Sequence, residues 1–217
     1  MINQKTIKAC IENGYRLLED AEYLSRLGSP SSVYMLSKLS QEEIAKAFIL
    51  ILIKEKALDW TKEVERSLNH HVSKQLIGII IDYLNPETDE FIKMMENGTL
   101  FTNPRKVIDA MNIYVNEILL RWKSKNWWWS EDPEYNEEAK STYNGKDDRL
   151  KQDSIYIKIS SDGEMTSSPN KITEEMAQKE IEKANRFYFF VNRMKGDELQ
   201  YKKIVEIFKD LKLNLKD

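Results

Sequence analysis

The sequence has few of the residues that break helices, form cross-links or bind metals. Among 217 residues there are one cysteine, two histidines, five prolines and seven glycines. Because a disulfide needs two cysteines and the usual zinc sites need several, the lone Cys10 excludes an internal disulfide framework and a cysteine-based zinc site. A reduced compartment fits this composition. The scarcity of proline and glycine leaves few helix breakers and therefore favours long helices.

The sequence also lacks a long hydrophobic run and a strong charge of one sign. The longest apolar run, Ala47–Ile53, is far shorter than the roughly 20 residues that span a membrane, and Met1–Ile11 mixes polar and apolar residues, unlike a signal peptide. With 33 Lys and Arg against 36 Asp and Glu, the net charge is only -3. No overall field attracts nucleic acid or anionic lipid. We therefore expect a cytoplasmic protein without a membrane partner, in which any nucleic-acid contact is local.

The dominant period of the apolar residues is helical. The expected helices are Thr6–Leu27, Pro30–Lys54, Asp59–Leu68, His70–Leu84, Asp89–Glu96, Arg105–Lys125, Thr173–Arg193 and Asp197–Leu213. Gly28 ends the first helix, and Ser29 with Pro30 begins the second, so these two helices should form an antiparallel hairpin. Asn69 is expected to cap the helix that begins at His70.

One segment is typical of β structure. Ile155–Ile159 is rich in β-branched residues between polar turn signals, which predicts a strand paired with Glu164–Thr166 in a hairpin at about 153–167. The polar stretch before it, about 127–150, is expected to be an exposed insertion. Because two strands alone do not make a domain, residues 1–217 should form a single all-α domain that carries the hairpin. The expected core includes Ala47, Phe48, Ile51, Leu52, Leu76, Ile79 and Ile80.

The two histidines are adjacent, and an arginine precedes them. Four residues separate Arg66 from His71. Arginine offers a permanently charged, forked donor for a phosphate, and a neutral imidazole suits proton transfer near neutral pH. The pair could therefore perform phosphodiester chemistry. The alternative is that both histidines are solvated and merely open a helix.

Helical geometry bears on which histidine could act with Arg66. On an unbroken helix, a residue four positions later lies about 40° around the axis and a residue five positions later about 140° around it, which favours His70. If Asn69 caps a new helix, the chain bends before His71 and this angle no longer applies. We expect that bend, and we therefore expect His71 to be the proton acceptor and Arg66 to stabilise charge on phosphate oxygens.

Two adjacent glutamates interrupt the apolar surface of the second expected helix. Glu42 and Glu43 lie between the apolar segments 33–39 and 47–53. A carboxylate in such a place is at the edge of the apolar stripe or is buried with a partner. Lys46 follows at helical spacing and could form an ordinary ion pair with either glutamate. The alternative is that one glutamate faces inward and orients a residue of the Arg66–His71 segment.

Two segments resemble a known family. Gln41–Ala47 resembles the Glu-Glu-x-x-Lys-Ala signature of AbiV-type abortive-infection proteins, and Arg149–Ile157, followed by Ser168-Pro169, resembles their Lys-Gln-x-x-Leu-Tyr-Val and Ser/Thr-Pro elements. The resemblance runs from about Ala9 to Asn192. It implies a HEPN fold, an all-helical bundle that usually dimerises, in a bacterial protein that restricts phage multiplication.

The resemblance also implies a site. Many HEPN proteins are metal-independent ribonucleases with an Arg followed four to six residues later by His, which matches Arg66 and His71 as catalytic residues. The residue after the arginine is usually Asn, Asp or His; Ser67 stands there and can still hydrogen-bond a phosphate. Superfamily structures place an acidic residue of the second helix beside the motif. The supporting residues expected are therefore Glu42, Glu43, Lys46, Ser67 and His70.

The leading functional hypothesis is an endoribonuclease of antiphage defence that needs no cofactor or metal. A homodimer would bring two Arg–His pairs into one cleft; the expected partners are an RNA substrate and a phage-encoded activator protein. The first alternative is a non-catalytic module that binds a phage or host protein, and a weaker one is tRNA or nucleotide binding without turnover. Trp127–Trp129 could pack partly inside, contact a partner or stack on bases.

Overall fold

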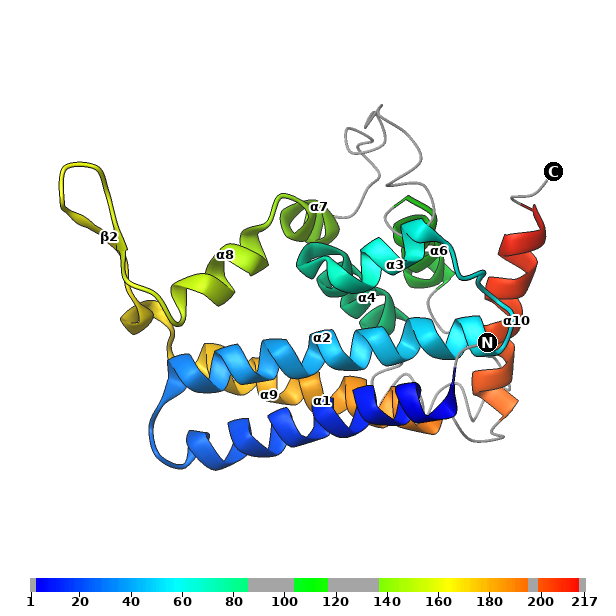
Figure 1. The fold of residues 1–217 in the computed structure, drawn as a ribbon, viewed down its shortest axis with the longest axis horizontal. Helices are drawn as coiled ribbons and strands as arrows, with labels where there is room; N and C mark the ends of the chain where they lie inside the picture. Colours follow the sequence, from blue (N-terminus) through cyan, green and yellow to red (C-terminus); the bar gives the residue numbers. More distant parts are fainter. Residues whose placement is uncertain (1–2, 86–103, 117–136, 195–198, 215–217) are drawn as a thin grey trace.

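The computed structural model describes residues 3–85, 104–116, 137–194 and 199–214 (Figure 1). Its elements are α1 (Gln4–Ser25), α2 (Pro30–Lys54), α3 (Lys62–Asn69), α4 (His71–Leu84), α6 (Pro104–Ile113), α7 (Glu137–Tyr143), α8 (Lys146–Asp153), β1 (Lys158–Ile159), β2 (Met165–Ser167), η3 (Pro169–Lys171), α9 (Glu174–Arg193) and α10 (Leu199–Asn214). The fold is all-α with one small antiparallel hairpin towards the C-terminal third, as the sequence predicts.

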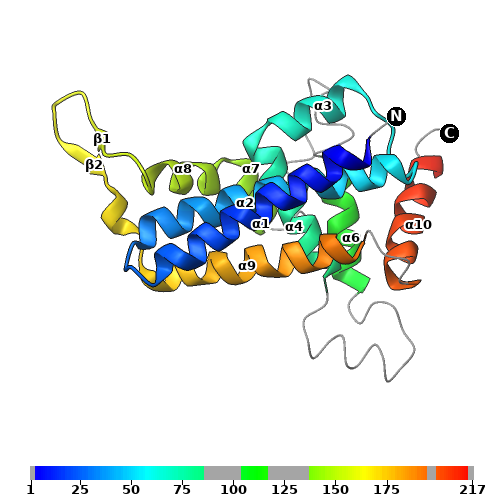
Figure 2. The ribbon, with the colours of Figure 1, turned by 60° about the horizontal axis from the view of Figure 1, so that its bottom comes forward.

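Three long helices form the base of the bundle. Helices α1, α2 and α9 lie side by side along the long axis (Figures 1 and 2). The turn between α1 and α2 needs a left-handed residue, which Gly28 supplies with a φ of +68°. At Gly14 a Cβ would come within 2.6 Å of the Ile44 side chain, so the glycine permits a close approach of α1 to α2. There Ser40 Oγ donates to the Gly14 carbonyl at 2.7 Å.

Helix α2 lies at the centre of the molecule. It contacts α1 and α9 on one side and α4 and α8 on the other (Figure 1). This position explains why α2 is apolar on more than one face, as a helix surrounded by protein must be. All seven residues expected in the core are buried: Ala47, Phe48, Ile51, Leu52, Leu76, Ile79 and Ile80.

The structure differs from the prediction for the segment before the hairpin. Residues 127–150 were expected to form an exposed insertion, but the described part contains α7 and most of α8, which pack on α4 and α2. Ala139 and Thr142 are buried there. Small side chains such as these give only a weak apolar signal among many polar residues. The sequence pattern therefore indicated an exposed segment. The first strand is shorter than predicted, because the backbone N–H groups of Ile155 and Tyr156 donate to the Gln152 carbonyl at the end of α8. The second strand, Met165–Ser167, begins one residue later than predicted.

The observed ends of several helices can be compared with the predicted ones. Thr61 caps α3 with its side chain, so this helix begins at Lys62 rather than Asp59. Thr173 caps α9 with its side chain, so the expected helix Thr173–Arg193 begins one residue later, at Glu174. The expected helix Asp89–Glu96, the end of the expected helix Arg105–Lys125 and the cluster Trp127–Trp129 lie outside the described residues. None of the described helices is long and apolar enough to span a membrane.

Candidate functional site

The candidate site is built around a buried carboxylate. Glu42, in the middle of α2, is 2% exposed. Its Oε2 lies 2.9 Å from Lys74 Nζ and 2.7 Å from His71 Nδ1. Its Oε1 lies 2.5 Å from Lys151 Nζ and 3.3 Å from Gln75 Nε2. Both carboxylate oxygens therefore accept from two donors each, which compensates for the removal of the charge from water.

Two helices supply these donors to Glu42 on α2. His71, Lys74 and Gln75 lie in the first two turns of α4, where one side of the helix faces α2. Lys151 comes from α8, which contacts both α2 and α4. We call Glu42, His71, Lys74, Gln75 and Lys151 the Glu42 cluster. Its members come from three separate parts of the chain, which meet because α4 and α8 both pack on α2.

The lysines of the Glu42 cluster offset the charge of its buried carboxylate. Burial alone would raise the pKa of Glu42, but the charges of Lys74 and Lys151 and their hydrogen bonds outweigh burial and hold the pKa of this carboxyl below its ordinary value. Asp148 adds a second carboxylate, 3.1 Å from Lys151. With Asp148, which is partly exposed, two carboxylates face the two lysines.

His71 connects this buried cluster to solvent. Its side chain is 55% exposed, while its Nδ1 faces Glu42. Because an ionised carboxylate can only accept, the 2.7 Å contact with Glu42 favours a proton on Nδ1 and leaves Nε2 as the lone-pair acceptor. A histidine held in this way by a carboxylate can take a proton at Nε2. The contact expected between the Glu42–Glu43 pair and the Arg66–His71 segment is therefore present, and Glu42 makes it.

Glu43 has a different role. It pairs with Lys46 Nζ at 2.5 Å, three residues later on the same helix, and both side chains are partly exposed. Successive residues on a helix differ by 100° in direction, so Glu43 cannot point with Glu42 towards α4. The ordinary helical ion pair is thus the correct interpretation for Glu43 and Lys46, and neither residue enters the Glu42 cluster.

Arg66 and Ser67 lie on α3, apart from the Glu42 cluster. The Arg66 side chain is exposed, and within the described part of the chain no hydrogen bond or ion pair joins it to His71. Ser67 is fully buried, and its hydroxyl donates to the Glu63 carbonyl of the same helix at 3.1 Å. Arg66 is therefore accessible to a ligand, whereas Ser67 faces the protein interior.

His70, rather than Asn69, caps α4, so the predicted cap is corrected by one residue. Asn69 stays in α3, where its side chain donates to the Glu65 carbonyl at 3.0 Å. His70 is extended, with φ -99° and ψ 123°, and its Nδ1 accepts from the Ser73 backbone N–H at 3.3 Å. An imidazole nitrogen with a lone pair can replace the oxygen of a usual cap. The predicted bend between Arg66 and His71 is present, and His71 is the first residue of α4.

Sequence reasoning missed Lys74, Gln75 and Lys151. A signal for Lys74 did exist, since no lysine, arginine, aspartate or glutamate other than Lys74 precedes Asp82 in the mostly apolar helix α4, and its charge is opposite to that of Glu42. Lys151 lies in the Lys-Gln pair of the family pattern, but its acidic and polar neighbours indicated an exposed segment. Its burial is a consequence of how α8 packs.

A second buried charged cluster lies on α2, one helical turn before Glu42. Lys38 Nζ is 3.0 Å from Glu180 and 3.7 Å from Asp147, and Gln41 Nε2 donates to Glu180 at 2.8 Å. We call Lys38, Gln41, Asp147 and Glu180 the Lys38 cluster. A cavity of about 10 Å³, enough for about one water, separates it from the Glu42 cluster.

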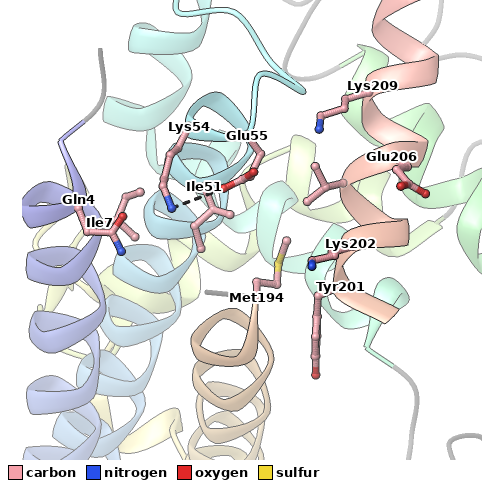
Figure 3. A pocket seen from close by; sticks show the side chains of 11 residues that line it. Gln4, Ile7, Ile51, Lys54, Glu55, Met194, Tyr201, Lys202, Glu206 and Lys209 are labelled. Atoms are coloured by element: carbon pink, nitrogen blue, oxygen red, sulfur yellow. Dashed lines mark ion pairs between the residues drawn. The ribbon is translucent and has the colours of Figure 1, made fainter. Parts of the chain in front are cut away.

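A larger cavity of about 320 Å³ lies near the C-terminal ends of α2 and α9 and beside α10 (Figure 3). Apolar residues line it together with three lysines and two glutamates: Lys54, Lys202, Lys209, Glu55 and Glu206. It contains no residue of the Glu42 cluster. Among the described residues, no group of three or more His, Cys, Asp and Glu side chains is arranged to hold a metal ion.

Comparison with known proteins identifies the family of the chain. The HEPN_AbiV family model, described as AbiV, matches residues 3–188. This stretch contains both segments that resemble the family and every member of the Glu42 cluster. No curated protein and no solved structure matches the chain significantly. Because the family match covers most of the sequence, the chain belongs to the AbiV family of HEPN proteins.

Proposed function

We propose that this protein acts in antiphage abortive infection as a metal-independent endoribonuclease. Membership of the AbiV family supports the role in abortive infection. The observation that carries the chemistry is the 2.7 Å contact between Glu42 Oε2 and His71 Nδ1, on a histidine whose side chain is half exposed. The contact orients the ring and directs Nε2 to the surface, where RNA can reach it.

The reaction begins at an RNA 2′-hydroxyl. His71 Nε2 takes the hydroxyl proton, and the oxygen attacks the adjacent phosphorus. The P–O5′ bond breaks, a 2′,3′-cyclic phosphate forms, and the leaving 5′-oxygen takes a proton from solvent. The exposed guanidinium of Arg66 pairs with the phosphate oxygens as charge develops on them. The buried carboxylate of Glu42 stabilises the imidazolium that results.

The functional unit of the proposal is a homodimer. One histidine and one arginine make a sparse phosphate site, and a two-fold axis would place two such pairs in a shared cleft. RNA is the substrate, and a phage-encoded protein is the proposed trigger. The alternative function, a non-catalytic module that binds a phage or host protein, is favoured by one observation: Arg66 makes no described contact with His71.

The two histidines provide a matched test. Wild type, His71→Ala and His70→Ala are produced in the same bacterial cells, and growth and RNA integrity are followed with and without phage. His71→Ala should lower RNA cleavage by about 10²–10⁴-fold, the usual loss when a proton-transfer group is removed, whereas His70→Ala should retain it. Phage restriction by His71→Ala with intact RNA would reject the ribonuclease and support the interaction module. A wild-type protein that is monomeric at micromolar concentration would reject the shared cleft.

A further inference from the structure

The His71 ring has two neighbours that favour opposite positions of its proton. Glu42 Oε2, at 2.7 Å from Nδ1, can only accept a hydrogen bond. Lys151 Nζ, at 3.0 Å from the same nitrogen, can only donate one. The shorter contact favours Glu42 as the partner of Nδ1, so Lys151 acts on the ring mainly through its charge.

Lys151 is held in this place by several contacts. Its ammonium lies 2.5 Å from Glu42 Oε1 and 3.1 Å from Asp148 Oδ1. The last turn of α8 is tied down by Ser154, whose hydroxyl donates to the Lys151 carbonyl at 2.6 Å. Because Lys151 is buried, it cannot reach a substrate phosphate. Any effect on catalysis must pass through Glu42 and His71.

The charges that face His71 come from three helices. Glu42 on α2 attracts a second proton to the ring, whereas Lys74 on α4 and Lys151 on α8 oppose it. Asp148 on α8 partly offsets Lys151, and His70, the preceding residue, is engaged as the cap of α4. Lys151 is the only one of these lysines with a described contact to the imidazole itself. It is therefore the group best placed to oppose ring protonation.

We propose that Lys151 is a positioning residue that keeps the His71 ring neutral and ready to accept a proton at Nε2. It does so by sharing the charge of Glu42 and by placing its own positive charge beside Nδ1. Helix α8 thereby completes the site, although it lies 80 residues further along the chain than His71. The catalytic meaning of this role rests on the proposed ribonuclease, but the effect on the His71 proton does not.

The test follows the His71 proton directly by NMR. The chain has only two histidines, so the ring signals of His71 are assigned by comparison with His70→Asn, which keeps a capping side chain. His71 is then titrated in wild type, Lys151→Met and Lys151→Gln. Loss of a charge at 3.0 Å should move the midpoint of the His71 titration to higher pH by about one unit or more. Lys151→Arg, which keeps the charge, should restore the wild-type midpoint.

Lys38→Met is the matched control. Lys38 is a buried lysine on α2 that pairs with Glu180, so its loss removes a similar charge without touching His71. The His71 midpoint should stay at its wild-type value in this variant. An unchanged midpoint in folded Lys151→Gln, or an equal shift in Lys38→Met, would overturn the proposal. So would a protein in which no Lys151 variant folds while Lys38→Met does, because Lys151 would then be purely structural.

RNA cleavage separates this proposal from the ribonuclease itself. If wild type cleaves RNA, the acidic limb of the pH profile of kcat/KM in Lys151→Gln should move by the same amount as the His71 titration. If wild type cleaves no RNA, the proposed function fails, while the titration still decides whether Lys151 controls the ring. A profile that does not move while the titration does would show that His71 is not the base.

Discussion

The two buried charged clusters on α2 look alike but differ in what they can do. Lys38 and Glu42 are four residues apart, on the same side of the helix, and α8 supplies a partner to each: Asp147 to Lys38 and Lys151 to Glu42. The Lys38 cluster contains no histidine. The Glu42 cluster contains His71, which reaches from the buried carboxylate to the surface.

This comparison separates a structural role of buried charge from a chemical one. Lys38 also lies over the ring of Tyr34, 5.6 Å from its centroid, and burial raises the pKa of that phenol further above its ordinary range. The Lys38 cluster and the phenol beside it therefore include no imidazole. Buried ion pairs of this kind hold helices in register but often add little net stability. In the Glu42 cluster the half-exposed His71 contacts the buried carboxylate, and we propose that this contact serves proton transfer.

The largest expected difference is in stability when each cluster loses its acid. Glu42→Gln leaves Lys74 and Lys151 buried without their shared counter-charge and should lower the free energy of unfolding by about 3–5 kcal/mol. Glu180→Gln should cost less, about 1–3 kcal/mol, because Lys38 keeps Asp147 and Glu180 is nearer to solvent. Urea unfolding followed by circular dichroism measures both. Equal losses would show that the two clusters are equivalent.

Acid should distinguish the clusters next. Because the pKa of Glu42 is lowered in the folded protein from its ordinary 4.5, the stability it contributes is fully present above pH 4.5 and is lost as pH falls through the lower folded value. Wild type should therefore lose stability below pH 4.5 more steeply than Glu42→Gln, which has no carboxyl at this position. Thermal unfolding between pH 3 and 7 gives both slopes. Parallel slopes would contradict the link between Glu42 and its lysines.

Substitution of the two neighbouring histidines should affect stability less, and each histidine should affect a different property. His70→Ala removes the side-chain cap of α4 and should lower the free energy of unfolding by about 1 kcal/mol, with RNA cleavage retained. His70→Asn, which keeps a cap, should restore that stability. His71→Ala should affect cleavage far more than folding. Loss of cleavage in His70→Asn would show that the wrong histidine has been assigned.

The smallest effect is expected at Glu43. Its ion pair with Lys46 lies within one helix, and both side chains are partly exposed. Helical ion pairs of this kind contribute about 0.3–0.5 kcal/mol. Glu43→Ala should change the urea midpoint only slightly and leave the His71 titration as in wild type. Added salt should weaken the wild-type pair further. A loss comparable to that of Glu42→Gln would mean that both glutamates belong to the buried cluster.

Much of the fold follows from the sequence. The positions of α1, α2, α4 and α9 could be predicted because helical periodicity and capping signals act over neighbouring residues, and the core residues from Ala47 to Ile80 followed from the same pattern. The segment of α7 and α8 could not, because its few buried side chains are small or charged. Periodicity detects apolar surface, and this segment contributes little of it.

By itself, the sequence determined that the chain is helical, that it bends between Arg66 and His71, and that a glutamate lies in an apolar part of α2. These features depend on short-range geometry. Only the tertiary structure decided that Glu42 rather than Glu43 meets His71, that Ser67 faces inward and that Lys151 completes the cluster. A buried charge takes partners from whichever helices pack against it, and the direction in which a helix rotates within the core is set by the whole bundle.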